Sequence, residues 1–323
     1  KNELNLRYSN KTAHILENEE KGTVLISGGT TNIHPVWSPD EKRFAYLSSK
    51  EHDNFGQTDL FFYDFSDSIS QKIAAGVHTA SSWINDSTII YTKRSKPNKW
   101  GSKFFDLYIY TFNDAGEERV THDSRLISPT YNPALNQIAA ITTYDGTSNI
   151  MITNALDLTK EDIEFYPITH LENGMHMLSL AWIGDELYVD AVHHQGRQIY
   201  KVIIAIDELV PVATARWDNR DQEKIHEGII YAKDQSGIFN LVLQKDGNEK
   251  YITNVEGGAF MPSVSSNGKI LFSLFEEGRY NISIIDREQD VPTKMVGYET
   301  HYFDHYPSSQ LIIGEALPSN PYK

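Results

Sequence analysis

The chain has 323 residues, 40% of them hydrophobic and 23% charged, which suffices for the core of one large repeat domain or two ordinary domains. Its 29 basic and 44 acidic residues give a formal net charge of −15, which argues against nucleic-acid binding because that surface must neutralise phosphates. The absence of cysteine excludes a disulfide scaffold, a thiolate zinc site and a cysteine nucleophile, and no apolar run is long enough to predict a transmembrane helix.

The residue types favour an all-β fold. The chain contains 18 Tyr, 14 Phe and 5 Trp, and its β-branched and aromatic runs are short and bounded by Gly, Asn, Asp or Pro. No amphipathic helix of about ten residues or more is predicted. Residues 158–165 are compatible with one or two helical turns at most.

In chain order, two strand-like runs, Thr12–Leu16 and Thr23–Ser27, precede the first clear repeat unit. That unit opens with the sequence HPVWSPD at residues 34–40, which reads as a short strand followed by a tight turn at Pro-Asp. It continues as three more short strands at residues 43–47, 58–64 and 71–74. One unit therefore consists of four strands.

The same order of strands recurs along the chain, and each unit has a marker residue at the end of its first strand. The seven markers are Trp37, Trp83, Tyr131, Trp182, Lys224, Val264 and His305. Successive markers lie 46, 48, 51, 42, 40 and 41 residues apart. A four-stranded unit of about 40–50 residues is typical of a β-propeller blade. The aromatic markers are interpreted as packing residues between blades.

The seventh unit, around His305 and residues 311–313, lacks outer strands, which the two N-terminal runs can supply. We therefore expect the N-terminal outer strands to pair with the C-terminal inner strands, because a closed ring leaves no exposed sheet edge. Seven blades is the favoured count, and a six-bladed ring with extra terminal strands is the alternative. The propeller is expected to span residues 1–317, with 318–323 as a linker to a further domain.

The first unit resembles the WD-like repeat of TolB-type propellers, whose pattern is P-x-W-S-P-D-G-K, an apolar strand, D-I-Y and an R-x-L-T ending. The matching segments are Pro35–Asp40, Arg43–Tyr46 and Thr58–Phe61, and the sequence departs from the pattern at Glu41, where the family has Gly. The resemblance extends over nearly the whole chain. It implies a propeller that serves as a protein-interaction or scaffold module, periplasmic or outer-membrane-associated, in a bacterial cell envelope.

Other propellers of this type suggest alternatives. Some are accessory domains of larger peptidases or outer-membrane barrel proteins, and others are stand-alone oligogalacturonate lyases. The sequence contains no G-x-S-x-G, H-E-x-x-H or P-loop motif, so an enzyme is the less favoured interpretation and no cofactor is expected. A protein or peptide is the expected partner. The enzymatic alternative is a propeller lyase or hydrolase that acts on an acidic sugar.

Four histidines precede their markers by 3 to 6 residues, where the innermost strands begin at one mouth of the channel: His34, His78, His176 and His301. Imidazoles from different blades can converge on a metal or an anionic ligand, and oligogalacturonate lyases have a His-rich metal site in a similar place. The simpler interpretation is that these histidines lie scattered in polar loops. We expect no tightly held metal, because carboxylate companions at ligand spacing are missing.

A second candidate site is a basic loop between the second and third strands of its unit, on the same face as the histidines. It contains five cations and one tryptophan within residues 93–103: Lys93, Arg94, Lys96, Lys99, Trp100 and Lys103. One interpretation is a solvated hairpin loop. The other is a docking loop for an acidic partner or an anionic headgroup, with Trp100 inserted into the partner.

Overall fold

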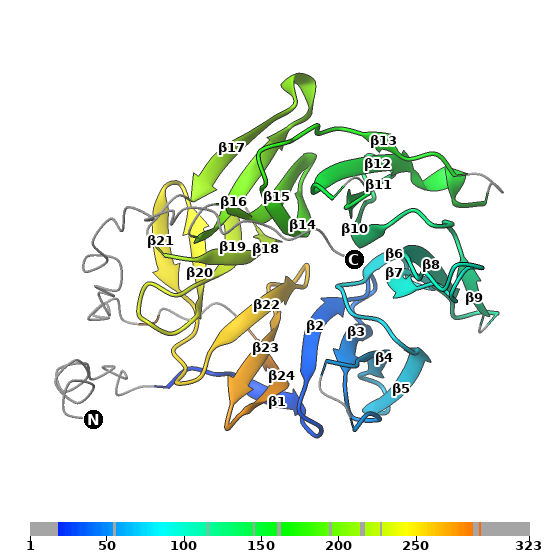
Figure 1. Ribbon diagram of the computed structural model, residues 1–323. Helices are drawn as coiled ribbons and strands as arrows, with labels where there is room; N and C mark the ends of the chain where they lie inside the picture. The colour runs from blue at the N-terminus through cyan, green and yellow to red at the C-terminus, as the bar shows by residue number, and fades with distance from the viewer. Residues whose placement is uncertain are drawn as a thin grey trace, which may run out of the picture.

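The computed structural model describes residues 19–286, except 54–55, 115, 145, 160–162, 194–195, 214–216 and 227, together with Val291. Six four-stranded antiparallel sheets are arranged around a central channel, as in a β-propeller (Figure 1). The chain is therefore all-β, as predicted. Among the described residues, no helix is long and apolar enough to cross a membrane.

Five blades are built from four consecutive strands each. Blade 1 contains β2 (Asn32–Trp37), β3 (Arg43–Ser48), β4 (Asp59–Asp64) and β5 (Ile69–Ala74). Blade 2 contains β6 (Ser82–Asn85), β7 (Thr88–Arg94), β8 (Phe105–Thr111) and β9 (Gly116–Arg119). Blade 3 contains β10 (Leu126–Asn132), β11 (Gln137–Thr142), β12 (Asn149–Asn154), the 3₁₀ helix η1 (Ala155–Thr159) and β13 (Tyr166–Pro167).

The remaining blades follow the same plan, with one exchange of strands. Blade 4 contains β14 (His176–Ile183), β15 (Glu186–His193), β16 (Gly196–Ile203), the 3₁₀ helix η2 (Ile204–Ile206) and β17 (Glu208–Ala213). Blade 5 contains β18 (Asn219–Ile225), β19 (Gly228–Lys233), β20 (Asn240–Lys245) and β21 (Asn248–Tyr251). Blade 6 contains β22 (Ala259–Val264), β23 (Ile270–Glu276), β24 (Arg279–Ile285) and, as its outermost strand, β1 (Thr23–Ile26).

The favoured count of seven blades is wrong, and the ring has six. The unit that contains Val264 has only three strands of its own, and β1 supplies the fourth by pairing with β24, Thr23 opposite Ile284. The N-terminal strand assigned to a seventh unit is thus used to close the sixth. The strand exchange between the two ends of the propeller occurs, but one blade earlier than expected. Residues 12–16, the unit around His305 and the expected linker 318–323 lie outside the described residues.

The core is divided among the six interfaces between neighbouring blades. Alternate residues of one strand face opposite neighbours: Ala45 and Leu47 of β3 pack toward blade 2, whereas Phe44 and Tyr46 pack toward blade 6. The marker Trp83 packs in the first of these clusters and donates its indole N–H to Val36 O of the preceding blade at 3.1 Å. This supports the interpretation of the marker as a packing residue.

A polar clamp explains why several units end in threonine. In blade 5, Thr253 Oγ1 donates to Asn240 Oδ1 at 3.0 Å and accepts from the Leu241 N–H at 2.8 Å. Asn240 Oδ1 also accepts from Val255 N at 3.0 Å, which fixes the segment leading to blade 6. The same arrangement is built from the pairs Asp106–Thr121 and Asn149–Thr169. Because these groups are buried, each of their hydrogen bonds satisfies an otherwise costly polar atom.

The inner strands bend where they line the channel. The pairing of each inner strand with its neighbour is irregular, and His34, Ser128, Asp221 and Met261 have φ values of 53°, 51°, 58° and 53°. Three of these residues precede a proline, which has no N–H to donate and therefore fits a bulge. The bulges turn the residues beside them toward the axis of the ring.

Candidate functional site

The channel narrows to a cavity of about 120 Å³ that is lined by residues from the inner strands of all six blades. Most of these residues are small, such as Ser81, Ser128 and Ser179, but blade 5 contributes Asp221, Gln222 and Glu223 instead. Blade 5 therefore provides the carboxyl and amide side chains among the residues that line this cavity. The sequence already carried a signal for this, because its fifth unit has a charged DQEK run where other units have Ser, Thr or Pro.

Gln222 is the most unusual residue of the channel wall. Its side chain is almost completely buried, with the residue 4% exposed, and neither amide atom has a hydrogen-bond partner among the described residues. The hydroxyl of Ser81, which lines the same cavity, also lacks a partner in this part of the chain. These donors and acceptors can bind a small polar molecule, such as water, within the channel.

Burial shifts two titratable groups of the channel, His34 and Glu223, toward their neutral forms. Burial lowers the pKa of His34 to about 4, and Arg220 and Arg197 add to this effect while Asp221 opposes it. Burial raises the pKa of Glu223 to about 7, and the neighbouring Lys224 compensates only in part.

Glu223 gives a pH-dependent prediction. Its folded pKa lies above the ordinary glutamate value of 4.5, so ionisation destabilises the fold progressively as the pH rises from 4.5 to about 7. We expect Glu223→Gln to remove this effect and to be more stable than the parent by about 2 kcal/mol at pH 8, with little difference at pH 4.5. Urea unfolding at both pH values measures this, and Glu118→Gln on an exposed strand is the control. A gain of equal size at both pH values would refute it.

The structure places the predicted histidines at different depths. His34 lines the channel, whereas His176 is exposed at the beginning of the inner strand β14 and His78 is exposed in the segment that precedes β6. His176 Nδ1 lies 3.3 Å from Ser148 Oγ, and burial is the main cause that lowers the pKa of His78. His301 lies outside the described residues. Among the residues that are described, no group of three or more His, Asp or Glu is suited to hold a metal ion.

The basic loop is an ordered hairpin extension between β7 and β8. Asn98 Oδ1 accepts hydrogen bonds from Trp100 N at 2.9 Å and Ser102 N at 3.0 Å, which forms a tight turn at the tip. At its base, Ser95 and Phe104 are joined by a backbone hydrogen bond of 2.8 Å. The turn holds Trp100 outward, 78% exposed, with Lys99 Nζ 4.9 Å from the ring centre.

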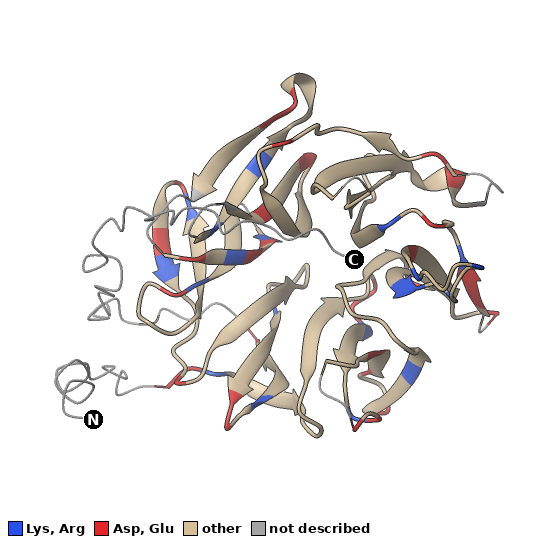
Figure 2. Cartoon of the chain, in the orientation of Figure 1, with Lys and Arg blue, Asp and Glu red and all other residues tan. Residues whose placement is uncertain are grey.

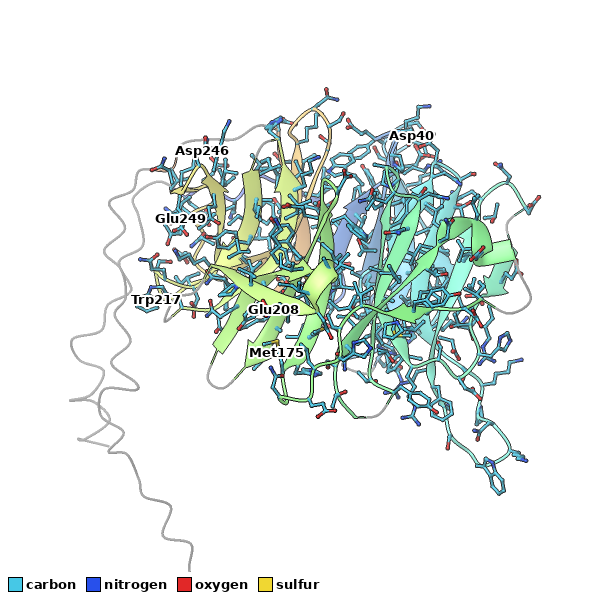
Figure 3. The ribbon with its side chains drawn as sticks, turned by 90° about the horizontal axis from the view of Figure 1, so that it is seen from above. Asp40, Met175, Glu208, Trp217, Asp246 and Glu249 are labelled. Atoms are coloured by element: carbon cyan, nitrogen blue, oxygen red, sulfur yellow. The ribbon has the colours of Figure 1, made fainter. Side chains whose placement is uncertain are left out.

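The cations of the loop divide into two groups. Lys93 Nζ forms an ion pair with Glu117 at 2.7 Å, and the Arg94 guanidinium lies 5.0 Å above the Phe105 ring. In contrast, Lys96, Lys99 and Lys103 form no ion pair with any described residue. The structure thus pairs two of the predicted cations at the base of the loop and leaves three, between Ser95 and Phe104, without an ion pair to any described residue. Seen edge-on in Figure 3, the loop projects beyond the ring on the same side as Met175, opposite Asp40.

A groove of about 480 Å³ opens between blades 2 and 3, near the base of the basic loop. Its apolar walls are formed by Val120, Leu126, Met151, Ile163, Phe165 and Pro167. Sequence reasoning missed this groove, because its residues come from three separate segments whose proximity depends on how the two blades pack.

Comparisons with known proteins address the fold. Neither the scan against protein-family models nor the search of curated proteins finds a match. Among solved structures, TolB from Acinetobacter baumannii is similar with a TM-score of 0.57 and 15% identity, over 74% of this chain and 58% of that protein. The fold is a TolB-like β-propeller. The chain matches less than two thirds of that TolB structure.

The chain is also similar in fold to propeller regions of proteases. The β-propeller domain of the Trilobed protease from Pyrococcus furiosus matches with a TM-score of 0.52 and 13% identity, over 83% of this chain and 84% of that one. The tricorn protease matches with a TM-score of 0.54 and 12% identity, over 82% of this chain but only 27% of that protein. At these identities the comparisons establish the fold and leave the function to be argued from the site.

Proposed function

We propose that this chain is a non-catalytic interaction module of a bacterial envelope protein or complex, in which the loop between β7 and β8 docks an acidic protein partner. The observation that carries this proposal is the outward presentation of Trp100 by the Asn98 turn, beside three lysines that have no acidic partner in the described structure. Exposing a tryptophan to water is unfavourable, and tryptophan flanked by cations is typical of an interaction hot spot.

The charge of the whole chain supports the same assignment. With a net charge of −15, most of the surface repels an acidic partner, so a small basic area selects the orientation of docking. Figure 2 shows basic residues on blade 2 and beside the start of β10, as well as on other blades. The field of the loop cations extends about 8–10 Å at physiological salt, which limits it to the surface near the loop.

A triple substitution tests the docking loop. Replacing Lys96, Lys99 and Trp100 with Ser is expected to weaken binding of an acidic partner captured from envelope extracts by at least about tenfold, without changing thermal stability. The remaining binding should depend less on salt, because two of the cations are gone.

The matched control has the same loss of two lysines and one exposed apolar side chain elsewhere on the ring: Lys42, Lys269 and Leu156 replaced with Ser. Equal binding by the loop variant and this control, with both proteins fully folded, would show that the loop is only a solvated hairpin.

A second candidate role is that of an accessory propeller in a larger peptidase or barrel protein. It is supported by the matched propeller of the Trilobed protease, which is one domain of a protease. This role is compatible with partner docking, since the partner is then a neighbouring domain. Sequencing the full-length gene product decides whether a catalytic or barrel domain accompanies the propeller.

A further inference from the structure

The groove between blades 2 and 3 results from the short outer strand of blade 3. Strand β13 contains only two residues, which pair with Met151 and Ile152 of β12, whereas the outer strands of blades 1 and 4 contain six residues each. Met151 therefore contributes to the wall of an open groove as well as to the apolar cluster between the blades. A volume of about 480 Å³ is enough to enclose a large side chain with part of the backbone that carries it.

Arg125 connects the groove to the basic loop. Its guanidinium carbon lies 4.8 Å from the ring centre of Phe104, the last residue of the loop, and 5.4 Å from that of Tyr144. Arg125 Nη1 also donates to Tyr144 O at 2.7 Å. Ser124 and Leu126, on either side of Arg125, line the groove, as does Tyr144. Loop and groove are thus neighbouring parts of one surface, with a cation at their junction.

At this junction, Arg125 has an unfavourable backbone conformation and Tyr144 is exposed to solvent. Arg125 has a φ of 55°, an unfavourable value for a residue with a side chain, and its stacking and hydrogen bonding hold it there. Tyr144 is 69% exposed although its ring lies beneath the guanidinium. Trp100 on the basic loop and Tyr144 in the wall of the groove are therefore two exposed aromatic rings.

We propose that the groove and the basic loop form one two-part site for an acidic peptide segment that inserts a large apolar or aromatic side chain between blades 2 and 3. The proposal rests on the proposed function and specifies the chemistry of the partner. Lys96, Lys99, Lys103 and Arg125 attract carboxylates, while the walls formed by Met151, Phe165 and their neighbours exclude water from an apolar side chain.

The basic loop and the apolar groove each require a different property of the ligand. An anion without an apolar group would leave the groove unused, and an uncharged apolar ligand would not need the lysines. A peptide supplies both on one extended backbone. It also supplies its own carboxylates on both sides of the inserted residue, which suits a groove with a cation at its rim.

The test measures binding of three labelled synthetic peptides by fluorescence anisotropy: an acidic peptide with a central Phe, the same peptide with a central Gly, and the Phe peptide with Lys in place of every acid. The parent protein is expected to bind the acidic Phe peptide at least about tenfold more tightly than the Gly peptide, because only the former buries a large side chain. The Lys peptide should not bind.

Variants of the protein test which part of the site binds the apolar side chain and which part binds the acidic residues of the peptide. Met151→Glu places a carboxylate in the groove and is expected to abolish the preference for Phe over Gly, whereas the nearly isosteric Met151→Gln retains part of it. The triple Ser variant of the loop should lose binding of both acidic peptides. Thermal unfolding of each variant establishes that it is folded.

Other outcomes separate this inference from the proposed function. Equal binding of the acidic Phe and Gly peptides to the parent protein would overturn the role of the groove and leave the docking loop intact. No binding of either acidic peptide would overturn both. Binding of anionic phosphatidylglycerol vesicles in place of the peptides, insensitive to Met151→Glu, would overturn the assignment of a peptide as the partner.

Discussion

Deleting residues 1–27 is expected to abolish the cooperative unfolding transition of the propeller and to cause aggregation. The deletion removes β1, the outermost strand of blade 6. Among the described strands of this blade, β1 alone comes from the N-terminal part of the chain. Without β1, the backbone groups of β24 become an exposed sheet edge that can pair with another molecule. The loss also uncovers the apolar cluster that joins blades 6 and 1, to which Ile26 contributes.

Several contacts around β1 make this effect large. Ser283 Oγ donates to Lys21 O at 2.5 Å, and Lys21 Nζ forms an ion pair with Glu276 at 2.6 Å. Gly22, with a φ of 65°, passes so close to blade 6 that a Cβ atom there would lie 2.3 Å from Ile284 O. Glu20 pairs with Asn254 in the segment that follows blade 5. The N-terminal segment thus ties blades 5 and 6 together.

Two measurements test the closure. Differential scanning calorimetry should show a sharp transition for the parent protein and none of comparable enthalpy for the deletion, while light scattering reports aggregation. Deleting residues 1–18 alone leaves β1 in place and serves as the control, which should unfold like the parent. A protein without residues 1–27 that unfolds as sharply and at the same temperature as the parent would contradict a role of β1 in closing the ring.

The repeat was predictable because its determinants are local. Alternating strands, the turn at Pro39-Asp40 and the terminal threonines recur along the chain, and the markers Trp37 to Val264 all lie in or beside inner strands. The blade count depends instead on the pairing of Thr23 with Ile284, two residues far apart in the sequence. A local pattern cannot decide whether an N-terminal strand completes the sixth unit or a seventh.

The candidate site also has a part that the sequence predicts and a part that depends on contacts between distant segments. The basic loop is a local feature of composition, so its position between the second and third strands of its unit was predictable. The groove beside it depends on the short β13 and on contacts of Arg125 with Phe104 and Tyr144, which lie on different segments. Gln222 and Glu223 were missed because the fifth unit has Lys224 where the first four units have an aromatic marker.

Replacing Arg197 with Met is expected to destabilise the protein by about 3–5 kcal/mol, because it leaves the buried carboxylate of Asp190 without its counter-ion among the described residues. Arg197 of β16 is 11% exposed at its side chain, and its Nη2 lies 2.6 Å from Asp190 Oδ2 and 3.1 Å from Asp221 Oδ1. Asp190 is completely buried and also accepts hydrogen bonds from Ser179 N and Asp221 N, at 2.9 Å and 2.7 Å. These contacts join blade 4 to blade 5 beside the channel.

The interface between blades 4 and 5 depends on this network more than other interfaces do. Its buried apolar cluster, Tyr188, Ile199, Tyr231 and Val242, is the smallest among the described residues. Burial alone would lower the pKa of Arg197, but the carboxylates of Asp190 and Asp221 raise it, so the guanidinium stays charged. Burial raises the pKa of Asp190 against the opposing attraction of Arg197.

The pH dependence of the stability lost in Arg197→Met distinguishes the loss of charge compensation from the loss of packing. Without Arg197, the pKa of Asp190 in the folded protein rises further. An acid whose pKa is higher in the folded than in the unfolded protein destabilises the fold only at pH values at which it is ionised in the unfolded chain. The loss of stability in Arg197→Met should therefore be largest at pH 8 and shrink as the pH falls. Arg197→Lys keeps the charge and should lose less, while Arg279→Met, at the exposed first residue of β24, should lose almost nothing. Equal losses for Arg197→Met and Arg197→Lys at every pH would show that packing, rather than charge compensation, makes Arg197 important for joining blades 4 and 5.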